Sequence, residues 1–176
     1  MRNIFIGLLF IFLDFNIDLD HTRIGLIPDF IGYIVLAKGL LHMADESPRF
    51  IKVKPFATFM AFYTGILYVL ELFGVTLNLG VFSYLLGIVS IVIPLYISYH
   101  IVMGVIDTEE KHNVFLNGAS LKSTWKLLTV FTILSYLLLL IPTLAILSII
   151  ASLVIAIVFL VAFNRSKNLY YNTISW

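Results

Sequence analysis

At 176 residues, with 61% hydrophobic and 12% charged residues, the chain carries about half the charge of a soluble domain, which averages roughly 25%. The net charge is +1, so composition gives no electrostatic basis for nucleic-acid binding. The absence of cysteine excludes disulfides, thiol catalysis and thiolate metal sites. The mean hydropathy of +1.05 instead indicates one all-α integral membrane domain over residues 1–176, a polytopic helical bundle in contact with the lipid bilayer.

The apolar segments predict about six spans, because a bilayer core about 30 Å thick requires roughly 20 residues per helix. The first segment resembles a signal peptide, but acidic residues from Asp14 stand where a cleavage site needs small ones, so we expect it to be uncleaved. Residues Leu127 to Phe163 are uncharged and would form a helix about 55 Å long, so we expect two spans that turn at Pro142. The predicted spans cover about residues 4–16, 24–43, 56–75, 79–106, 123–141 and 143–163.

The basic residues predict the orientation in the cell membrane. They fall between spans two and three, between spans four and five, and after span six: Arg49, Lys52, Lys54, Lys111, Lys122, Lys126, Arg165 and Lys167. By the positive-inside rule both termini are expected in the cytoplasm, with Arg23 as the exception. The acidic residues between the first two spans, together with Asp29 and Glu71, then lie towards the outer face.

The acidic stretch between the first two spans has oxygen-bearing side chains at alternate positions: Asp14, Asn16, Asp18 and Asp20. An extended strand would place all four on one edge, an arrangement suited to a divalent cation such as calcium. A likeness to an EF-hand loop fails, because Leu19 and Gly25 replace the required glycine and glutamate. If the helix continues instead, Asp14 and Asp18 lie one turn apart and form a paired-carboxylate metal site. A purely structural alternative is that these residues cap a membrane helix.

Glycines repeat at intervals of seven in two spans. They are Gly25, Gly32 and Gly39 in span two, and Gly80 and Gly87 in span four. Because small residues let membrane helices approach closely, we expect spans two and four each to pack in the bundle centre. Asp29 falls on the packed face of span two, so we expect it to be buried with a compensating partner. Arg23, His21, Tyr33 and a bound cation are the candidates.

Two histidines, His42 and His100, lie near the cytoplasmic ends of their spans. They are either interfacial hydrogen-bonding groups or a pair of ligands for haem or a metal. The chain contains no catalytic or nucleotide-binding motif of known spacing.

The segment Leu26-Ile27-Pro28-Asp29-Phe30-Ile31-Gly32-Tyr33-Ile34 follows Asp14-Phe15-Asn16 and precedes a basic connection at residues 47–56. Over about residues 10–56 the chain resembles a group of small polytopic membrane proteins of Gram-positive bacteria with an LPDFIGY-like second segment. Ile27 stands where that group has leucine. The resemblance implies the class of protein and no activity.

The leading functional hypothesis is binding or transport of a small ligand or cation at an outward-facing acidic site, without catalysis. The candidate ligand-binding residues are Asp14, Asn16, Asp18, Asp20, Arg23, Asp29 and Glu71. One alternative is an accessory subunit that binds another membrane protein through its helices. Another is a membrane-embedded, metal-dependent hydrolase that uses the paired aspartates.

Overall fold

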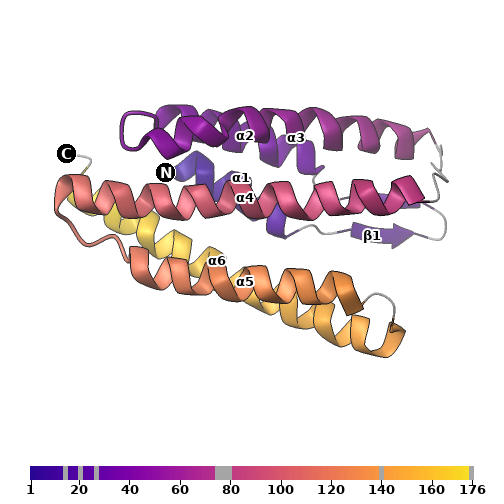
Figure 1. Cartoon of the computed structure of the whole chain (residues 1–176). Helices are drawn as coiled ribbons and strands as arrows, with labels where there is room; N and C mark the ends of the chain where they lie inside the picture. The colour runs from indigo at the N-terminus through magenta and orange to yellow at the C-terminus, as the bar shows by residue number, and fades with distance from the viewer. Residues whose placement is uncertain (14–15, 20–21, 26–27, 74–80, 139–140, 175–176) are drawn as a thin grey trace.

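The computed structural model of the chain describes residues 1–13, 16–19, 22–25, 28–73, 81–138 and 141–174, which form six helices and one two-stranded sheet (Figure 1). The helices are α1 (Arg2–Phe12), α2 (Asp29–His42), α3 (Pro48–Leu72), α4 (Val81–His112), α5 (Gly118–Leu138) and α6 (Pro142–Thr173). Strands β1 (Asn16–Leu19) and β2 (Thr22–Gly25) form an antiparallel hairpin between α1 and α2. The helical class predicted from composition is confirmed.

Three helices in the described part of the chain are long and apolar enough to cross a membrane. They comprise Pro48–Leu70 of α3, Leu85–His112 of α4 and Ile146–Thr173 of α6. Helices α1 and α2 have 11 and 14 residues, or about 17 and 21 Å, and are shorter than a bilayer core of about 30 Å. Crossing by all six segments therefore stays a prediction.

The largest departure from the predicted spans lies between α1 and α2. Helix α1 ends at Phe12 rather than at residue 16, and α2 begins at Asp29 rather than at residue 24, because the hairpin lies between them. Aspartate and asparagine compete with helical hydrogen bonds, whereas branched residues such as Ile17 and Ile24 favour strands. The extended alternative is therefore correct for β1, where Asp18 lies in a strand and not in a helix, while Asp14 lies outside the described residues.

Helix α3 begins at Pro48 rather than near residue 56. The Ser47 hydroxyl accepts a hydrogen bond of 3.2 Å from the backbone N–H of Arg49 and so caps the helix, while Pro48 suits the first helical position. The first two turns of α3 carry Arg49, Lys52 and Lys54, the basic residues predicted to lie between spans two and three.

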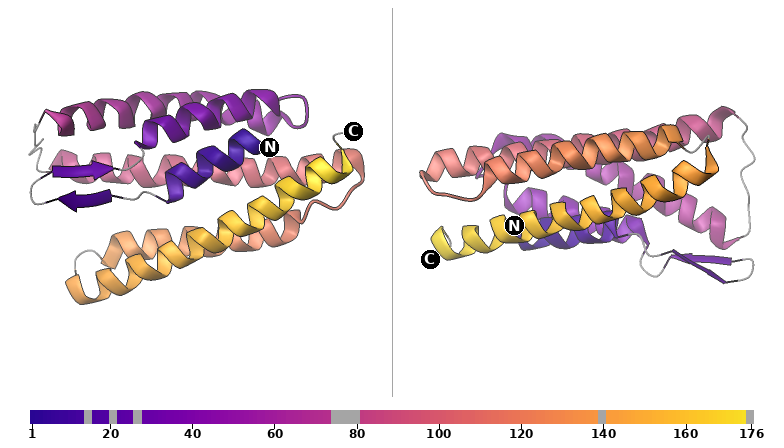
Figure 2. Two further views of the ribbon diagram at one scale, coloured as in Figure 1. Left: turned by 180° about the vertical axis from the view of Figure 1, so that it is seen from behind. Right: turned by 90° about the horizontal axis from the view of Figure 1, so that it is seen from below.

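The helices pack chiefly against their neighbours in the chain, and α1 also packs against α6. Both termini lie at one end of the bundle, together with the α2–α3 and α4–α5 connections (Figure 1). Towards the opposite end, α5 and α6 tilt away from α3 and α4, and the hairpin lies in that half of the molecule (Figure 2).

The glycine-lined face of α2 contacts α1. A Cβ atom at Gly39 would lie 2.6 Å from the backbone nitrogen of Ile4. A Cβ atom at Gly32 would lie 2.9 Å from Cβ of Phe10. The two short helices therefore approach each other through backbone, which only residues without a side chain permit.

The other predicted packing glycines are distributed differently. Gly25 belongs to β2, where its register partner is Asn16, so it is not part of the α2 face. In α4, a Cβ atom at Gly87 would lie 3.2 Å from the Tyr136 hydroxyl of α5. Gly80 lies outside the described residues. The glycine repeat of span four thus corresponds, where it is described, to an α4–α5 contact.

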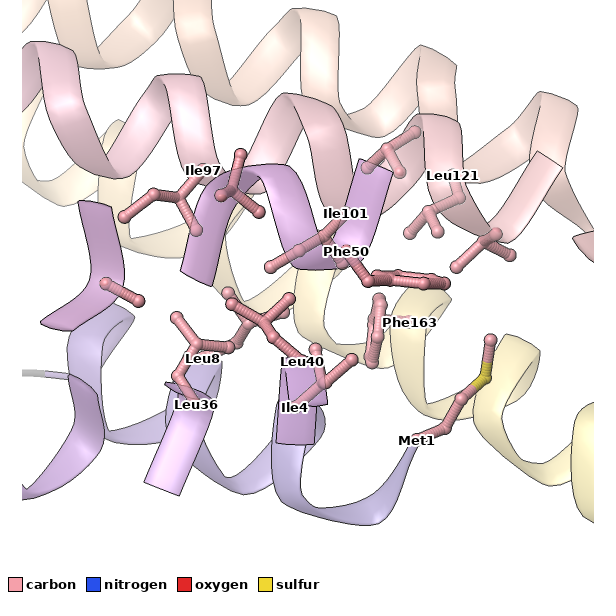
Figure 3. Packing of buried hydrophobic residues seen from close by; sticks show 14 of the residues in the cluster. Met1, Ile4, Leu8, Leu36, Leu40, Phe50, Ile97, Ile101, Leu121 and Phe163 are labelled. Atoms are coloured by element: carbon pink, nitrogen blue, oxygen red, sulfur yellow. The ribbon is translucent and has the colours of Figure 1, made fainter. Parts of the chain in front are cut away.

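The buried core fills the half of the bundle nearest the termini (Figure 3). Every helix contributes to it, with side chains that include Ile4, Leu8, Leu36, Leu40, Phe50, Ile97, Ile101, Leu121 and Phe163. The Phe50 ring lies flush against α4, because a Cβ atom at Gly104 would come within 2.7 Å of it. This packing holds the six helices together at the end where the polar connections lie.

Candidate functional site

The acidic hairpin is the site that the sequence singled out. Its register places Asn16 opposite Gly25 and Asp18 opposite Arg23. Residues two apart in a strand share a face, so the hairpin sets Asn16 and Asp18 on one face of β1. Three of the predicted ligand residues are thus neighbours in backbone position.

The remaining acidic candidates are described less fully. Asp14, Asp20 and His21 lie outside the described residues. Glu71 is in the last turn of α3, near the same end of the bundle, and its side chain is outside the described part. The prediction that these carboxylates share one ligand therefore remains a prediction.

Asp29 is the first residue of α2 and follows Pro28 in the N-cap position. A carboxylate there is stabilised by the positive end of the helix dipole, by about 0.3–1 kcal/mol at exposed positions. Its Oδ1 atom is buried. Tyr33, one turn further along α2, is only 2% exposed. The predicted burial of Asp29 is therefore correct for one of its carboxylate oxygens. Asp29 lies at the start of α2, the end that follows the hairpin.

A polar cluster that the sequence analysis missed lies at the opposite end, around Glu46 in the α2–α3 connection. His112 Nε2 lies 2.6 Å from Glu46 Oε2, the Tyr170 hydroxyl donates to Oε1 at 3.0 Å, and Lys111 Nζ donates to Oε2 at 3.2 Å. Lys111 also donates to the backbone carbonyl of Asp45 at 2.6 Å. One carboxylate thereby joins the ends of α4 and α6 to the α2–α3 connection.

These contacts set the ionisation of Glu46. Partial burial would raise the pKa of this carboxyl, but hydrogen bonds from His112, Tyr170 and Lys111 outweigh that effect and hold its pKa below the usual value. Glu46 is therefore favoured in its charged form. The charged Glu46 side chain thus links the α2–α3 connection to the ends of α4 and α6.

A second polar contact lies beside it. Asp107 of α4 accepts from Arg49 Nε at 2.8 Å and from the Ser47 hydroxyl at 2.6 Å. One feature of the sequence indicates both contacts. Acidic residues at 45–46 and 107–110 lie close in sequence to basic residues at 49–54 and 111. Besides indicating the orientation, two of those basic residues pair with carboxylates: Arg49 with Asp107 and Lys111 with Glu46.

The histidines have separate surroundings. His42 Nδ1 lies 2.7 Å from the backbone carbonyl of Lys38, which agrees with the hydrogen-bonding interpretation. His100 is buried between tyrosine rings, with ring centroids 4.6 Å from Tyr96 and 5.4 Å from Tyr99. Within the residues that the structure covers, no three His, Asp or Glu side chains are grouped to hold a metal ion.

A long apolar groove of about 810 Å³ runs between α2 and α3. The volume is within the range of small-molecule sites, about 300–1,000 Å³. Two cationic side chains, Lys38 and Lys54, are part of the lining. The other lining residues are Phe30, Ile34, Ala37, Leu41, Thr58, Ala61, Phe62, Gly65, Ile66, Tyr68, Val69 and Leu70.

The outward faces of the long helices decide the class of protein. Large apolar side chains such as Phe62, Leu147 and Val161 are more than 60% exposed on α3 and α6. Such continuous apolar surface is incompatible with water and suits lipid. Together with the three helices of spanning length, it places the chain among helical membrane proteins. Comparison of the chain with family models, with curated proteins and with solved structures finds no match.

Proposed function

We propose that the chain is a non-catalytic membrane protein that binds a small cation or cationic ligand at the acidic hairpin. The observation that carries this proposal is the break in helical structure between α1 and α2, where residues 16–19 and 22–25 are extended. The sequence places its densest group of carboxylates in the same break.

The position of the hairpin relative to the bilayer follows from charge. The basic residues of α3, α4, α5 and α6 all lie towards the bundle end that holds both termini (Figure 1). On the positive-inside rule this end is cytoplasmic, both termini are inside, and the hairpin lies in the outer half. Helix α1 and strand β1 together extend about 30 Å, at 1.5 Å per helical and 3.3 Å per strand residue. In the proposed six-pass arrangement, the first crossing consists of α1 and β1, and the second consists of β2 and α2.

A hairpin at this depth requires polar surroundings. Extended backbone leaves unpaired N–H and C=O groups at its edges, and lipid cannot satisfy them. Such backbone is tolerated within a membrane only where protein covers it or where it lines a water-filled cavity. Carboxylates in these positions mark ion or substrate paths, and interrupted helices form the ion sites of many transporters. Asp18, Asp29 and their acidic neighbours would supply oxygen ligands to a cation.

The test is a thermal-shift titration of the purified full-length protein with calcium, magnesium, sodium and small organic ammonium ions. We expect one of these to raise Tm for the wild type, and the shift to disappear in Asp14→Ala/Asp18→Ala and in Asp29→Asn. The matched control is Glu110→Ala, which removes an exposed carboxylate at the other end of the bundle. An undiminished shift in the aspartate variants would refute the site.

The same variants separate the alternatives. An accessory subunit would tolerate the aspartate substitutions, and Gly32→Leu, which disrupts the α1–α2 contact, would abolish its association with a partner. A hydrolase would lose its metal-dependent turnover when Asp14 and Asp18 are replaced by alanine. Kinship with the polytopic proteins of Gram-positive bacteria also remains a proposal.

A further inference from the structure

Three small residues, Ala37, Ala61 and Gly65, are part of the lining of the groove between α2 and α3. A Cβ atom at Gly65 would lie 3.6 Å from Cβ of Phe30, an ordinary van der Waals contact, so a methyl group fits there. The Phe30 and Tyr68 rings, with centroids 5.7 Å apart, lie towards the end of the groove away from the termini. From Lys54 to Leu70 the α3 side of the groove extends about 24 Å, at 1.5 Å per residue.

The groove opens to the exterior of the bundle and not to its core. Phe62 and Ile66, which line it, are 71% and 61% exposed, and α3 is one of the helices of spanning length. In a membrane this surface contacts acyl chains. The apolar length is more than half of a bilayer core of about 30 Å, so one extended acyl chain fits along it.

Two lysines make one end of this groove cationic. Lys38 lies one turn before the end of α2, and Lys54 lies in the second turn of α3, both near the basic end of the bundle. Within the described residues neither lysine takes part in a salt bridge. An unpaired ammonium group at membrane depth is costly, and its long stem lets it reach the headgroup level. Both charges therefore face the region where lipid phosphates lie.

We infer that this groove binds one anionic phospholipid, with its phosphate between Lys38 and Lys54 and an acyl chain along Ala61 and Gly65. The apolar lining accounts for the chain, and the two unpaired cations account for the headgroup. A juxtamembrane lysine favours anionic lipid by an amount equivalent to roughly fivefold in affinity. Two lysines at one site predict a preference of roughly 25-fold over a zwitterionic lipid.

The test is native mass spectrometry of the full chain, titrated with dioleoylphosphatidylglycerol or dioleoylphosphatidylcholine. We expect one phosphatidylglycerol to be retained selectively by the wild type, and the selectivity to disappear in Lys38→Gln/Lys54→Gln. The matched control is Lys52→Gln, which removes a charge from the same end of α3 but outside the groove. Equal retention of the two lipids by the wild type, or equal selectivity in the double variant and the control, would overturn the inference.

Filling the groove tests the acyl-chain part separately. Gly65→Leu places a branched side chain in the groove, whereas Gly65→Ala fits the available space. Leucine also favours a helix over glycine by about 1 kcal/mol, so the variant should keep its Tm. We expect Gly65→Leu to lose the bound lipid and Gly65→Ala to retain it. Lipid retained by a folded Gly65→Leu variant, or displaced from the wild type by inorganic phosphate alone, would contradict binding in the groove.

Discussion

Replacing Glu46 by alanine is expected to loosen the bundle at the end that holds both termini. The substitution removes the single acceptor shared by His112, Tyr170 and Lys111. The Glu46 side chain is 16% exposed, while those of His112 and Lys111 are 31% and 47% exposed. A hydrogen bond to a charged group contributes about 1.5–3 kcal/mol, and an exposed pair such as that with Lys111 about 0–1 kcal/mol.

Because the donors share one carboxylate, their contributions do not simply add. We therefore expect Glu46→Ala to lower the free energy of unfolding by about 2–4 kcal/mol. Glu46→Gln keeps a neutral acceptor and should cost roughly half as much. Unfolding in mixed micelles of sodium dodecyl sulfate and a mild detergent, followed by circular dichroism, measures these differences.

The pH dependence supplies an independent check. The folded-state pKa of Glu46 lies below its unfolded value of about 4.5, so its contribution is complete above that pH and is lost as pH falls through the folded pKa. Wild-type stability should therefore decline below about pH 4.5 more steeply than that of Glu46→Gln. Glu110→Ala is the control for a surface carboxylate. A loss under about 0.5 kcal/mol in Glu46→Ala, within the scatter for surface substitutions, would refute the reasoning.

Three further outcomes are expected. Gly39→Ala should cost about 1–3 kcal/mol, because its Cβ would lie 2.6 Å from the backbone of α1. Gly65→Ala, measured in the same unfolding assay, should stabilise by up to about 1 kcal/mol, because it gains helix propensity without a clash. Glu109→Ala should cost about 1–2 kcal/mol by leaving the backbone N–H groups of Leu116 and Gly118 without their acceptor, whereas an unchanged Tm would show that water replaces it. Single cysteines introduced at Asn78 and Glu110 in this cysteine-free chain should react with an impermeant maleimide from outside the cell only at Asn78, and the opposite pattern would invert the orientation.

The sequence predicted the helices where hydropathy alone decides them. The uncharged stretch from Leu127 to Phe163 contains the turn at Pro142, as expected, because no single helix of that length fits a bilayer. The hydropathy of the sequence does not predict the start of α3, because the basic residues at 49–54 lower the hydropathy without ending the helix. The cap at Ser47 and the proline that follows were the signals that place the start eight residues earlier.

The candidate site was predictable in its composition and not in its partners. Alternation from Asp14 to Asp20 correctly indicated extended chain at β1, because period two is a local property. Helix partners are set by the whole bundle, so the seven-residue glycine spacing revealed a contact face on α2 without revealing that α1 covers it. The Glu46–Tyr170 contact joins residues 124 apart, and nothing local in the sequence indicates it.

The contact between α1 and α6 has a consequence for assembly. Because each helix otherwise packs against its chain neighbour, successive pairs can form as the chain is inserted, with short loops to close. The α1–α6 contact and the Glu46–Tyr170 hydrogen bond can form only after α6 has been synthesised. Before that, Glu46 can accept hydrogen bonds from Lys111 and His112 of α4, and α1 packs chiefly against α2. We expect the docking of α6 to complete the packing around α1, so chains truncated before Pro142 should be degraded rapidly even though their helices are inserted.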